Sequence, residues 1–276
     1  MAQALLLRTH DSPMEKMPGH WLLARMGKRV LRPGGRELTQ RLLASLAIDS
    51  TDDVVEFAPG LGETARETLA RHPLSYIAVE RDPEATRTVA QILSGTDQRC
   101  VLGTAEQTGL ADASASVIYG EAMLSMQLPA AKARIVAEAV RLLRPGGRYG
   151  IHELCLLPDD VPGEIREAIA NDLSDEIHVG VRPLTSMEWR QLLESAGLVV
   201  TSVETAPMHL LEPRRLVQDE GFFHAIRFIF NVVRHQAARR RVLTMRRVFR
   251  KYKQHLAAVA VVAVVAVKPP NHVSEN

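Results

Sequence analysis

The stretch 54-VVEFAPGLGETA-65 decides the fold of this chain. It contains an apolar strand, a turn with two glycines and the start of a helix. From Gly60 it matches G-x-G-x-x-A, the pattern of a dinucleotide-binding loop, and Glu80 lies twenty residues further on, where that pattern places an acid on a ribose. Read from Glu56, the same residues match a second pattern, E-x-A-x-G-x-G, in which an acid lies inside the strand before the glycines. The stretch therefore predicts a loop that holds a nucleotide or a nucleoside after the first strand of a sheet.

Strands and helices alternate on both sides of this loop, which predicts βαβ units and a mostly parallel sheet. We expect a Rossmann-like three-layer α/β sandwich with seven strands, an antiparallel strand at one edge and an added helical insertion. Residues 1–35 form an N-terminal arm, and residues 36–276 form one domain with the insertion at 213–254, which is expected to hold two helices. The predicted strands are 54–58, 76–80, 99–102, 116–119, 148–154, 198–203 and 256–267.

Composition limits the classes of protein to which the chain can belong. Its 276 residues are 46% hydrophobic and 24% charged, which is typical of a globular domain. Two cysteines are too few for a zinc ribbon or a disulfide framework, and no metal site is predicted. The apolar run at 4–7 is too short for a signal peptide, and the twelve-residue run at 256–267 is too short to span a bilayer. We expect a cytoplasmic protein.

Three features around the loop favour a nucleoside with an ammonium group over a dinucleotide. Glu56 lies inside the first strand, where a dinucleotide has no use for an acid but a ligand with an ammonium group does. The segment 103-GTAEQTGLADAS-114 follows the third strand and offers Ala105 and Glu106 to an adenine ring. The segment 140-VRLLRPGGRYGI-151 gives a helix, a tight turn and the fifth strand. Over residues 36–206 the chain resembles the class I S-adenosylmethionine-dependent methyltransferases, and is similar to the ubiquinone and menaquinone biosynthesis type that acts on small molecules.

The resemblance implies S-adenosylmethionine as cofactor, S-adenosylhomocysteine as product, and a role for each matching residue. Glu80 would accept hydrogen bonds from the ribose hydroxyls, Arg81 would pack near the adenine, and Glu56 would face the methionine ammonium. Two positions depart from the family pattern: Ala58 replaces its first glycine, and Val117 replaces a frequent aspartate. The remaining predicted cofactor residues are Pro59, Gly60, Gly62, Thr104, Ala105, Glu106, Gly120 and Glu121.

Catalysis of methyl transfer needs a base only where the acceptor must lose a proton. Glu121 and His152 are the candidates to line the acceptor site, with Glu153 beside them; alternatively, His152 is a core histidine with both nitrogens bonded. The predicted activity is methyl transfer to a small, apolar acceptor. Two other classes stay open at this point: an NAD(P)-linked oxidoreductase, and a nucleoside-binding protein without turnover.

The insertion is basic and rich in phenylalanine. Residues 214–253 hold twelve Lys or Arg against two acids, in a chain whose net charge is +2, and five of its six phenylalanines. The apolar residues recur at helical spacing, which predicts amphipathic helices packed on the domain with a solvated basic face. The predicted apolar face of the first helix is Phe222, Phe223, Ile226, Ile229, Phe230 and Val233, and that of the second is Val242, Met245, Val248, Phe249 and Tyr252. We rank four functions for the insertion: a lid on the acceptor site, a homodimer contact, a membrane-surface contact, and last a nucleic-acid contact. The nucleic-acid contact is last because residues 120–123 are GEAM, where methyltransferases that act on bases have an Asn/Asp-Pro-Pro-Tyr/Phe motif.

Overall fold

The computed structural model describes residues 13–266, and an eight-stranded sheet lies at its centre. The strand order is β3-β2-β1-β4-β5-β8-β7, with the two-residue β6 paired to β5. The predicted mostly parallel sheet is confirmed: β8 runs antiparallel to both of its neighbours, one strand in from the edge formed by β7. Val267, the last residue of the predicted final strand, is outside the described range. The strands are Asp53–Phe57 (β1), Ser75–Glu80 (β2), Gln98–Leu102 (β3), Ala115–Glu121 (β4), Leu143–Leu156 (β5), Leu184–Thr185 (β6), Leu198–Pro207 (β7) and Leu256–Val265 (β8).

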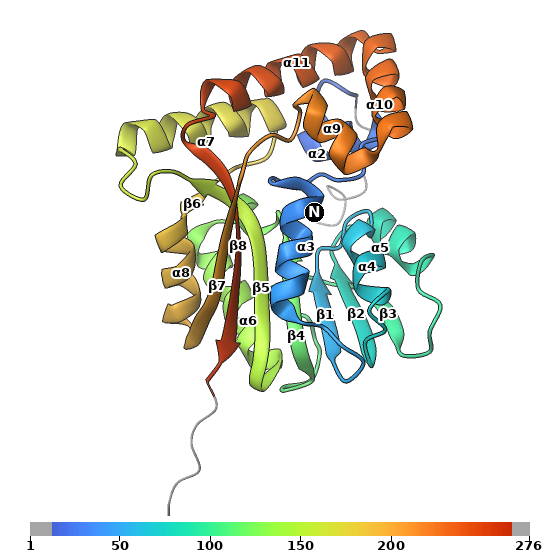
Figure 1. Ribbon diagram of the computed structural model, residues 1–276, viewed down its shortest axis with the longest axis vertical. Coiled ribbons are helices and arrows are strands. Elements are labelled where there is room, and N and C mark those ends of the chain that lie inside the picture. The colour runs from blue at the N-terminus through green and yellow to red at the C-terminus, as the bar shows by residue number, and fades with distance from the viewer. Residues whose placement is uncertain (1–12, 267–276) are drawn as a thin grey trace, which may run out of the picture.

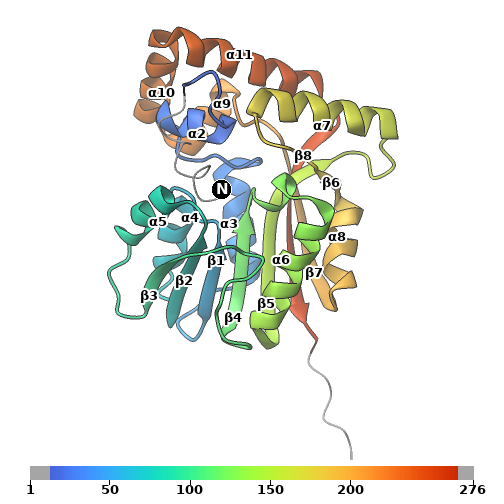
Figure 2. The ribbon, with the colours of Figure 1, turned by 180° about the vertical axis from the view of Figure 1, so that it is seen from behind.

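Helices cover both faces of this sheet and give the predicted three layers (Figure 1). One face carries Gly35–Leu46 (α3), Glu63–Leu69 (α4) and Pro83–Ala90 (α5), and their side chains share a core with β1, β2 and β4. The opposite face, seen in Figure 2, carries Pro129–Leu142 (α6) and Ser186–Ser195 (α8). The short 3₁₀ helix η1 (Leu124–Met126) follows β4.

The Val/Ala-rich strand β8 is buried on both faces, as its composition predicts. Val259 and Val261 pack into the core under α6 and α8, while the alternate residues Ala258 and Ala260 pack under α3. Strand β5 contains an irregularity where the sequence predicts a tight turn. Ala115 of β4 lies opposite Leu143, but Val117, two residues later, lies opposite Arg148, so residues 144–147 bulge out of an otherwise continuous ladder.

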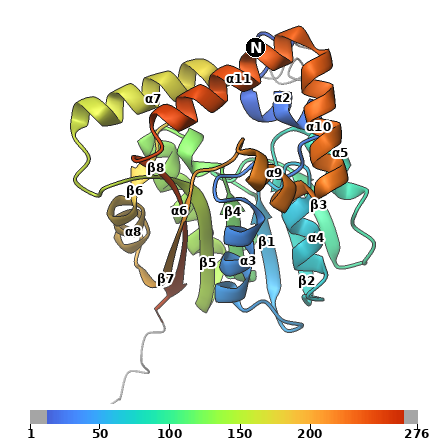
Figure 3. The ribbon, with the colours of Figure 1, turned by 45° about the horizontal axis from the view of Figure 1, so that its top comes forward.

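Five helices form a cap above the carboxyl ends of the strands (Figure 3). They bury a third hydrophobic cluster between them and the sheet. The prediction of two helices in the insertion is wrong: the segment forms three, because Gly221 takes a φ of 79° and separates the first from the second. The cap helices are Gly19–Arg25 (α2), Gly163–Ile177 (α7), Pro213–Glu220 (α9), Phe222–Arg234 (α10) and Gln236–Lys251 (α11).

The only two acids of the basic segment tie it to the N-terminal arm and to the first turn of α3. The Glu220 carboxylate accepts hydrogen bonds from the backbone N–H groups of Arg29 and Val30, both at 2.9 Å, and lies 3.4 Å from Lys28 Nζ. Asp219 accepts the backbone N–H of Arg36 at 3.0 Å. Burial favours neutral Lys28 and lowers its pKa, although Glu220 opposes this. The arm and the insertion therefore form one structure.

Helix α10 packs with a different face from the one the sequence predicts. It contacts the cap through Ala225, Phe228 and Val232. Apolar residues cover more than half of its circumference, so periodicity alone could not tell which side would be buried. Helix α11 does pack as predicted, through residues that include Met245 and Phe249. Within residues 13–266 no helix combines the length and hydropathy needed to cross a membrane. The predicted packing face of α10 is exposed: Phe222, Phe223, Ile226, Ile229, Phe230 and Val233.

Candidate active site

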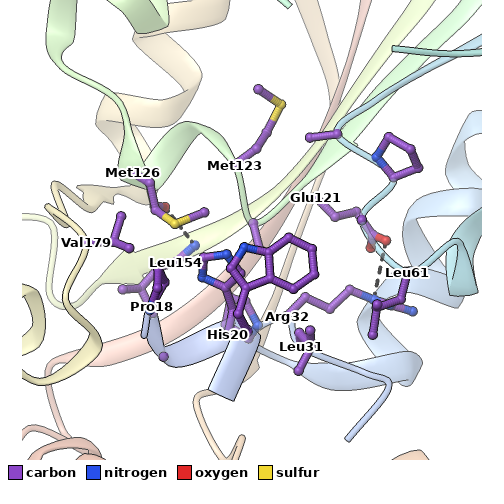
Figure 4. A pocket seen from close by; sticks show the side chains of 18 of the residues that line it. Pro18, His20, Leu31, Arg32, Leu61, Glu121, Met123, Met126, Leu154 and Val179 are labelled. Atoms are coloured by element: carbon purple, nitrogen blue, oxygen red, sulfur yellow. Dashed lines mark hydrogen bonds and ion pairs between the residues drawn. The ribbon is translucent and has the colours of Figure 1, made fainter. Parts of the chain in front are cut away.

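A cavity of about 400 Å³ lies between the carboxyl ends of the strands and the cap (Figure 4). Open α/β sheets bind their ligands at this edge. Three of the predicted site residues do not line the cavity: Gly62, Gly120 and His152. A Cβ added at Gly120 would instead meet Met123 Sδ at 3.0 Å and Phe57 Cβ at 3.4 Å. The predicted residues that the structure brings together around the cavity are Glu56, Ala58, Pro59, Gly60, Glu80, Arg81, Thr104, Ala105, Glu106 and Glu121.

The loop after β1 turns through left-handed backbone conformations. Gly60 has a φ of 56° and Gly62 a φ of 74°, which glycine adopts without strain. A methyl group on Gly60 would meet nothing within 4 Å, because that side opens into the cavity, whereas one on Gly62 would meet Ile92 Cδ1 at 2.7 Å. Ala58 also has a positive φ, 53°, at the position where the family has glycine. The alanine is therefore held in a strained conformation beside the site.

Glu80, at the carboxyl end of β2, is held by backbone donors. Its Oε2 accepts the N–H of Gly60 at 3.1 Å, and its Oε1 accepts those of Arg81 and Asp82 at 2.8 and 3.0 Å. Burial raises the pKa of Glu80, and the three N–H groups partly offset that rise. The carboxylate thus faces the cavity in a fixed orientation at the point where β2 ends.

Glu56 is buried between two tyrosines. The hydroxyl groups of Tyr76 and Tyr119 both donate to its Oε2, the second at 2.7 Å. Burial raises the pKa of Glu56 to about 7, even though both tyrosine hydroxyls favour the ionised form. Tyr119 takes this position because β4 lies beside β1, with Tyr119 paired to Glu56. Glu56 therefore reaches the cavity wall, where its charge depends on pH near neutrality.

Glu121 lies between the arm and the sheet. Its Oε2 is 3.3 Å from Arg32 Nε and accepts the Thr64 hydroxyl, and its Oε1 accepts the Thr39 hydroxyl at 2.6 Å. Burial by itself would raise the pKa of Glu121, but Arg32 and His152 outweigh it and lower the pKa to about 2. Figure 4 shows Arg32 and Glu121 paired at the cavity wall. Glu121 is thus a fixed negative charge.

Glu153 and its neighbour His152 lie on opposite faces of β5, since successive side chains of a strand point to opposite sides. Its buried carboxylate accepts the backbone N–H groups of Met123, Leu124 and Ser125 at 3.0, 2.7 and 2.9 Å, and the Ser125 hydroxyl at 2.7 Å. Burial raises the pKa of Glu153, and these donors oppose the rise. Glu153 therefore fixes the segment after β4, and with it Met123 at the cavity.

The edge of the cavity carries the more exposed predicted residues. Glu106 lines the cavity but pairs with Arg134, whose Nε lies 2.6 Å from its Oε2. Arg81 and Thr104 are exposed at the rim. Within the described residues, no three metal-ligating side chains are grouped together.

The other end of the cavity is apolar, and sequence reasoning missed most of it. Figure 4 shows His20 among Pro18, Met126, Leu154 and Val179. Trp21 lies beside His20, with ring centroids 5.1 Å apart. Helix α7 adds Leu173 and Ile177, and α11 adds Met245 and Phe249. His20 and Arg32 come from the arm, where no motif indicates a site, so only their position in the fold identifies them.

Known proteins resemble this chain in sequence and in fold. A family model described as a methyltransferase domain matches residues 55–151. A protein of Haemophilus influenzae described as uncharacterized is 30% identical over 220 residues, which cover 78% of this chain and 86% of that protein. Phosphoethanolamine N-methyltransferase 2 of Haemonchus contortus, solved with S-adenosyl-L-methionine, superposes with a TM-score of 0.69 at 12% identity, over 90% of this chain and 57% of that one.

A second solved structure, geranyl diphosphate methyltransferase in complex with GPP and sinefungin, has a TM-score of 0.61 at 14% identity, over 83% of this chain and 76% of that one. At such low identity these two structures show only a common fold. The fold and the loop after β1 define a Rossmann-like protein with a ligand site at the strand ends. The chain contains a methyltransferase domain, matched at residues 55–151, and has the fold of the class I S-adenosylmethionine-dependent methyltransferases. It is therefore a methyl-transferring enzyme, and the oxidoreductase and the binding protein without turnover are set aside.

Proposed function

We propose that this enzyme methylates a small, apolar acceptor that occupies the apolar end of the cavity, with S-adenosylmethionine at the polar end. The observation that carries the proposal is that one continuous cavity joins Glu80, Glu56 and the glycine loop to a chamber lined by apolar side chains. Ligand cavities of roughly 300–1,000 Å³ with a few convergent polar groups are typical of small-molecule sites.

The polar end offers groups that fit each part of the cofactor. An ionised carboxylate has about four acceptor positions, and Glu80 uses three of them on backbone N–H groups. It can accept one ribose hydroxyl as it stands, and a second would require the Gly60 N–H to move away. Arg32 Nη2 is buried and has no hydrogen-bond partner among the described residues. Because Arg32 lines the cavity near Glu121, its free Nη2 suits the carboxylate of the amino-acid tail.

The apolar end offers packing surface and one imidazole ring, that of His20. When bound, S-adenosylmethionine supplies a methyl group on a sulfonium, and the thioether that remains after transfer is a good leaving group. The chain's part is then to align the acceptor and exclude water, for which the position of α2, α7 and α11 over the cavity is suited. An acceptor hydroxyl or thiol that had to lose its proton would find His20 within the chamber, while His152 is out of reach.

Binding measurements with two ligands test the cofactor half of the proposal. 5′-Methylthioadenosine has the adenine and ribose of S-adenosylhomocysteine but lacks the amino-acid tail. Glu80→Gln is expected to weaken both ligands, and Arg32→Lys to weaken only S-adenosylhomocysteine, each by roughly 10- to 100-fold for loss of a charged hydrogen bond. Glu204→Gln, on β7, is the control and should change neither. Equal weakening of both ligands by Arg32→Lys would contradict its assignment to the tail.

A chamber-filling variant tests the acceptor half. Val179 lies in a loop at the apolar end, and Val179→Phe is expected to reduce the kcat/KM for acceptors while leaving the affinity for S-adenosylhomocysteine unchanged. Val199→Phe makes the same change at an exposed site on β7. Turnover is measured as S-adenosylhomocysteine release with alkyl phenols, thiols and amines, each beside an analogue hydroxylated along its alkyl chain. Turnover confined to the hydroxylated analogues would disprove the apolar acceptor.

A further inference from the structure

Helix α10 exposes a continuous apolar surface, here called the Phe face. Its six residues are 46–83% exposed, and Phe223 is the most exposed of them. At 100° per residue they fall within an arc of about 120° on one side of the helix. A soluble monomer rarely leaves so many large apolar side chains together in water, and such a patch usually marks an interaction site. The Phe face consists of Phe222, Phe223, Ile226, Ile229, Phe230 and Val233.

Positive charge adjoins the Phe face, and no negative charge opposes it within the same segment. Residues 221–254 contain ten Lys or Arg and no Asp or Glu. Arg227 and Arg234 lie next to the Phe face on α10, and the Arg234 guanidinium lies 5.3 Å from the centre of the Phe230 ring. Arg239 and Arg240 are exposed at the start of α11. None of these four forms an ion pair with a residue in the range 13–266, whereas Arg246 and Arg250, further along α11, pair with Glu212.

We infer that α10 docks this enzyme on the surface of a lipid bilayer that contains anionic lipids, with the Phe face in the acyl–headgroup boundary and the adjoining arginines on the headgroups. A helix with large aromatic and aliphatic residues on one side and basic residues beside them lies in the plane of such an interface. Helix α10 has 13 residues, so it rests on the bilayer and does not cross it.

A second copy of the chain fits this surface less well. A two-fold contact would bring the same patch onto itself, and the arginines of one copy would meet those of the other with no acid in residues 221–254 to neutralise them. A nucleic acid would match the charge but would leave the six apolar side chains without partners. An anionic bilayer satisfies both the apolar and the basic part of the surface.

The position of α10 connects the bilayer to the cavity. Helix α10 packs on α11, and Met245 and Phe249 of α11 line the apolar chamber. Docking through the Phe face therefore places the roof of the chamber at the lipid surface. The docking rests on the Phe face and on the arginines of α10 and α11, and it does not depend on which acceptor the chamber takes.

Co-sedimentation of the full chain with vesicles tests the inference. Vesicles of phosphatidylcholine alone are compared with vesicles of phosphatidylcholine and phosphatidylserine. We expect binding to the mixed vesicles that falls steeply as salt is raised, and weak binding to phosphatidylcholine alone. Phe223→Ala with Phe230→Ala should lower the partition coefficient at least about tenfold, because two large apolar side chains no longer enter the lipid. Leu74→Ala, which truncates another exposed apolar residue, is the control.

A charge variant separates headgroup binding from simple adhesion of an apolar patch. Arg239→Gln with Arg240→Gln should lower partition onto the mixed vesicles roughly 10- to 30-fold and leave the weak binding to phosphatidylcholine unchanged. Arg99→Gln with Arg190→Gln removes the same charge from other exposed sites and should have little effect.

Three results would overturn the inference. One is the absence of vesicle binding at low salt. Another is equal binding to both kinds of vesicle, unchanged by Arg239→Gln with Arg240→Gln. The third is a dimer in analytical ultracentrifugation without vesicles that Phe223→Ala with Phe230→Ala dissociates, since that would assign the Phe face to a second copy. Circular dichroism and melting temperature of each variant establish that it remains folded before its binding is compared.

Discussion

His152 Nδ1 lies 2.7 Å from Glu121 Oε1, so the two residues that the sequence puts forward for catalysis are bonded to each other. His152 Nε2 donates to the carbonyl oxygen of Pro33 at 2.5 Å, and the ring is fully buried outside the cavity. Both ring nitrogens of His152 are thus occupied by hydrogen bonds within the protein. His152 is therefore the core histidine of the two alternatives, and together with Glu121 it joins β4, β5 and the arm.

Glu121→Gln is expected to destabilise the protein by about 3–5 kcal/mol at neutral pH, because it leaves the buried Arg32 charge without its partner. The native pKa of Glu121 is depressed to about 2, below the ordinary value of 4.5, so its stabilising contribution is present above pH 4.5 and is lost as the pH falls toward 2. Urea unfolding across that range should show the difference between the two proteins narrowing. Glu204→Gln, which removes an exposed pair with Arg41, is the control. A difference that stays constant with pH would contradict the assignment.

Glu56 is expected to give the opposite pH dependence. Its native pKa is raised to about 7 from 4.5, so the folded state binds more protons in that window and the contribution of Glu56 to stability falls as the pH rises through it. The loss amounts to about 3 kcal/mol. Glu56→Gln keeps an acceptor for the two tyrosine hydroxyls but does not titrate, so its stability relative to the parent should increase between pH 4.5 and 7. Parallel stability curves for the two proteins would show that Glu56 is not desolvated.

Ala58→Gly is expected to stabilise the fold, because glycine adopts the left-handed conformation at this position without strain. The gain should be about 0.5–1 kcal/mol after the greater freedom of glycine in the unfolded chain is subtracted. Ala44→Gly, at an exposed position inside α3, should instead lose up to about 1 kcal/mol. Chemical denaturation of both variants gives the two signs. Destabilisation by both would mean that the loop does not hold Ala58 in that conformation.

Glu153→Gln should destabilise the protein by about 2–4 kcal/mol, since the amide replaces one acceptor oxygen by a donor that faces backbone N–H groups. Glu194→Gln, in an exposed pair with Arg190, should cost less than about 1 kcal/mol. Amide hydrogen exchange should become faster at Met123, Leu124 and Ser125 in Glu153→Gln. Unchanged protection at those three amides would show that Glu153 does not hold the segment.

The sequence could predict those parts of the fold and site that local patterns specify. The strand, glycine turn and helix at 54–65 are encoded by adjacent residues, and so is the capping box at Thr185, where Glu188 supplies the second half. The double burial of β8 follows from its unbroken Val/Ala run. Glu80 lies at the cavity because it is the last residue of β2, and the cavity lies at the carboxyl ends of the strands. Each of these features depends on hydrogen bonds or hydrophobicity within a few residues of one another.

Tertiary structure alone decided which distant segments complete the site. His20 and Arg32 belong to an arm without motifs, and Glu220, nearly two hundred residues away in the chain, binds the backbone of that arm at Arg29 and Val30. The burial of His152 depends on Pro33 in the same way. Helix α10 has apolar residues on more than one side, and its neighbours in the cap select the side that is buried. Local propensity cannot specify such choices, because their energies come from contacts that exist only once the chain has folded.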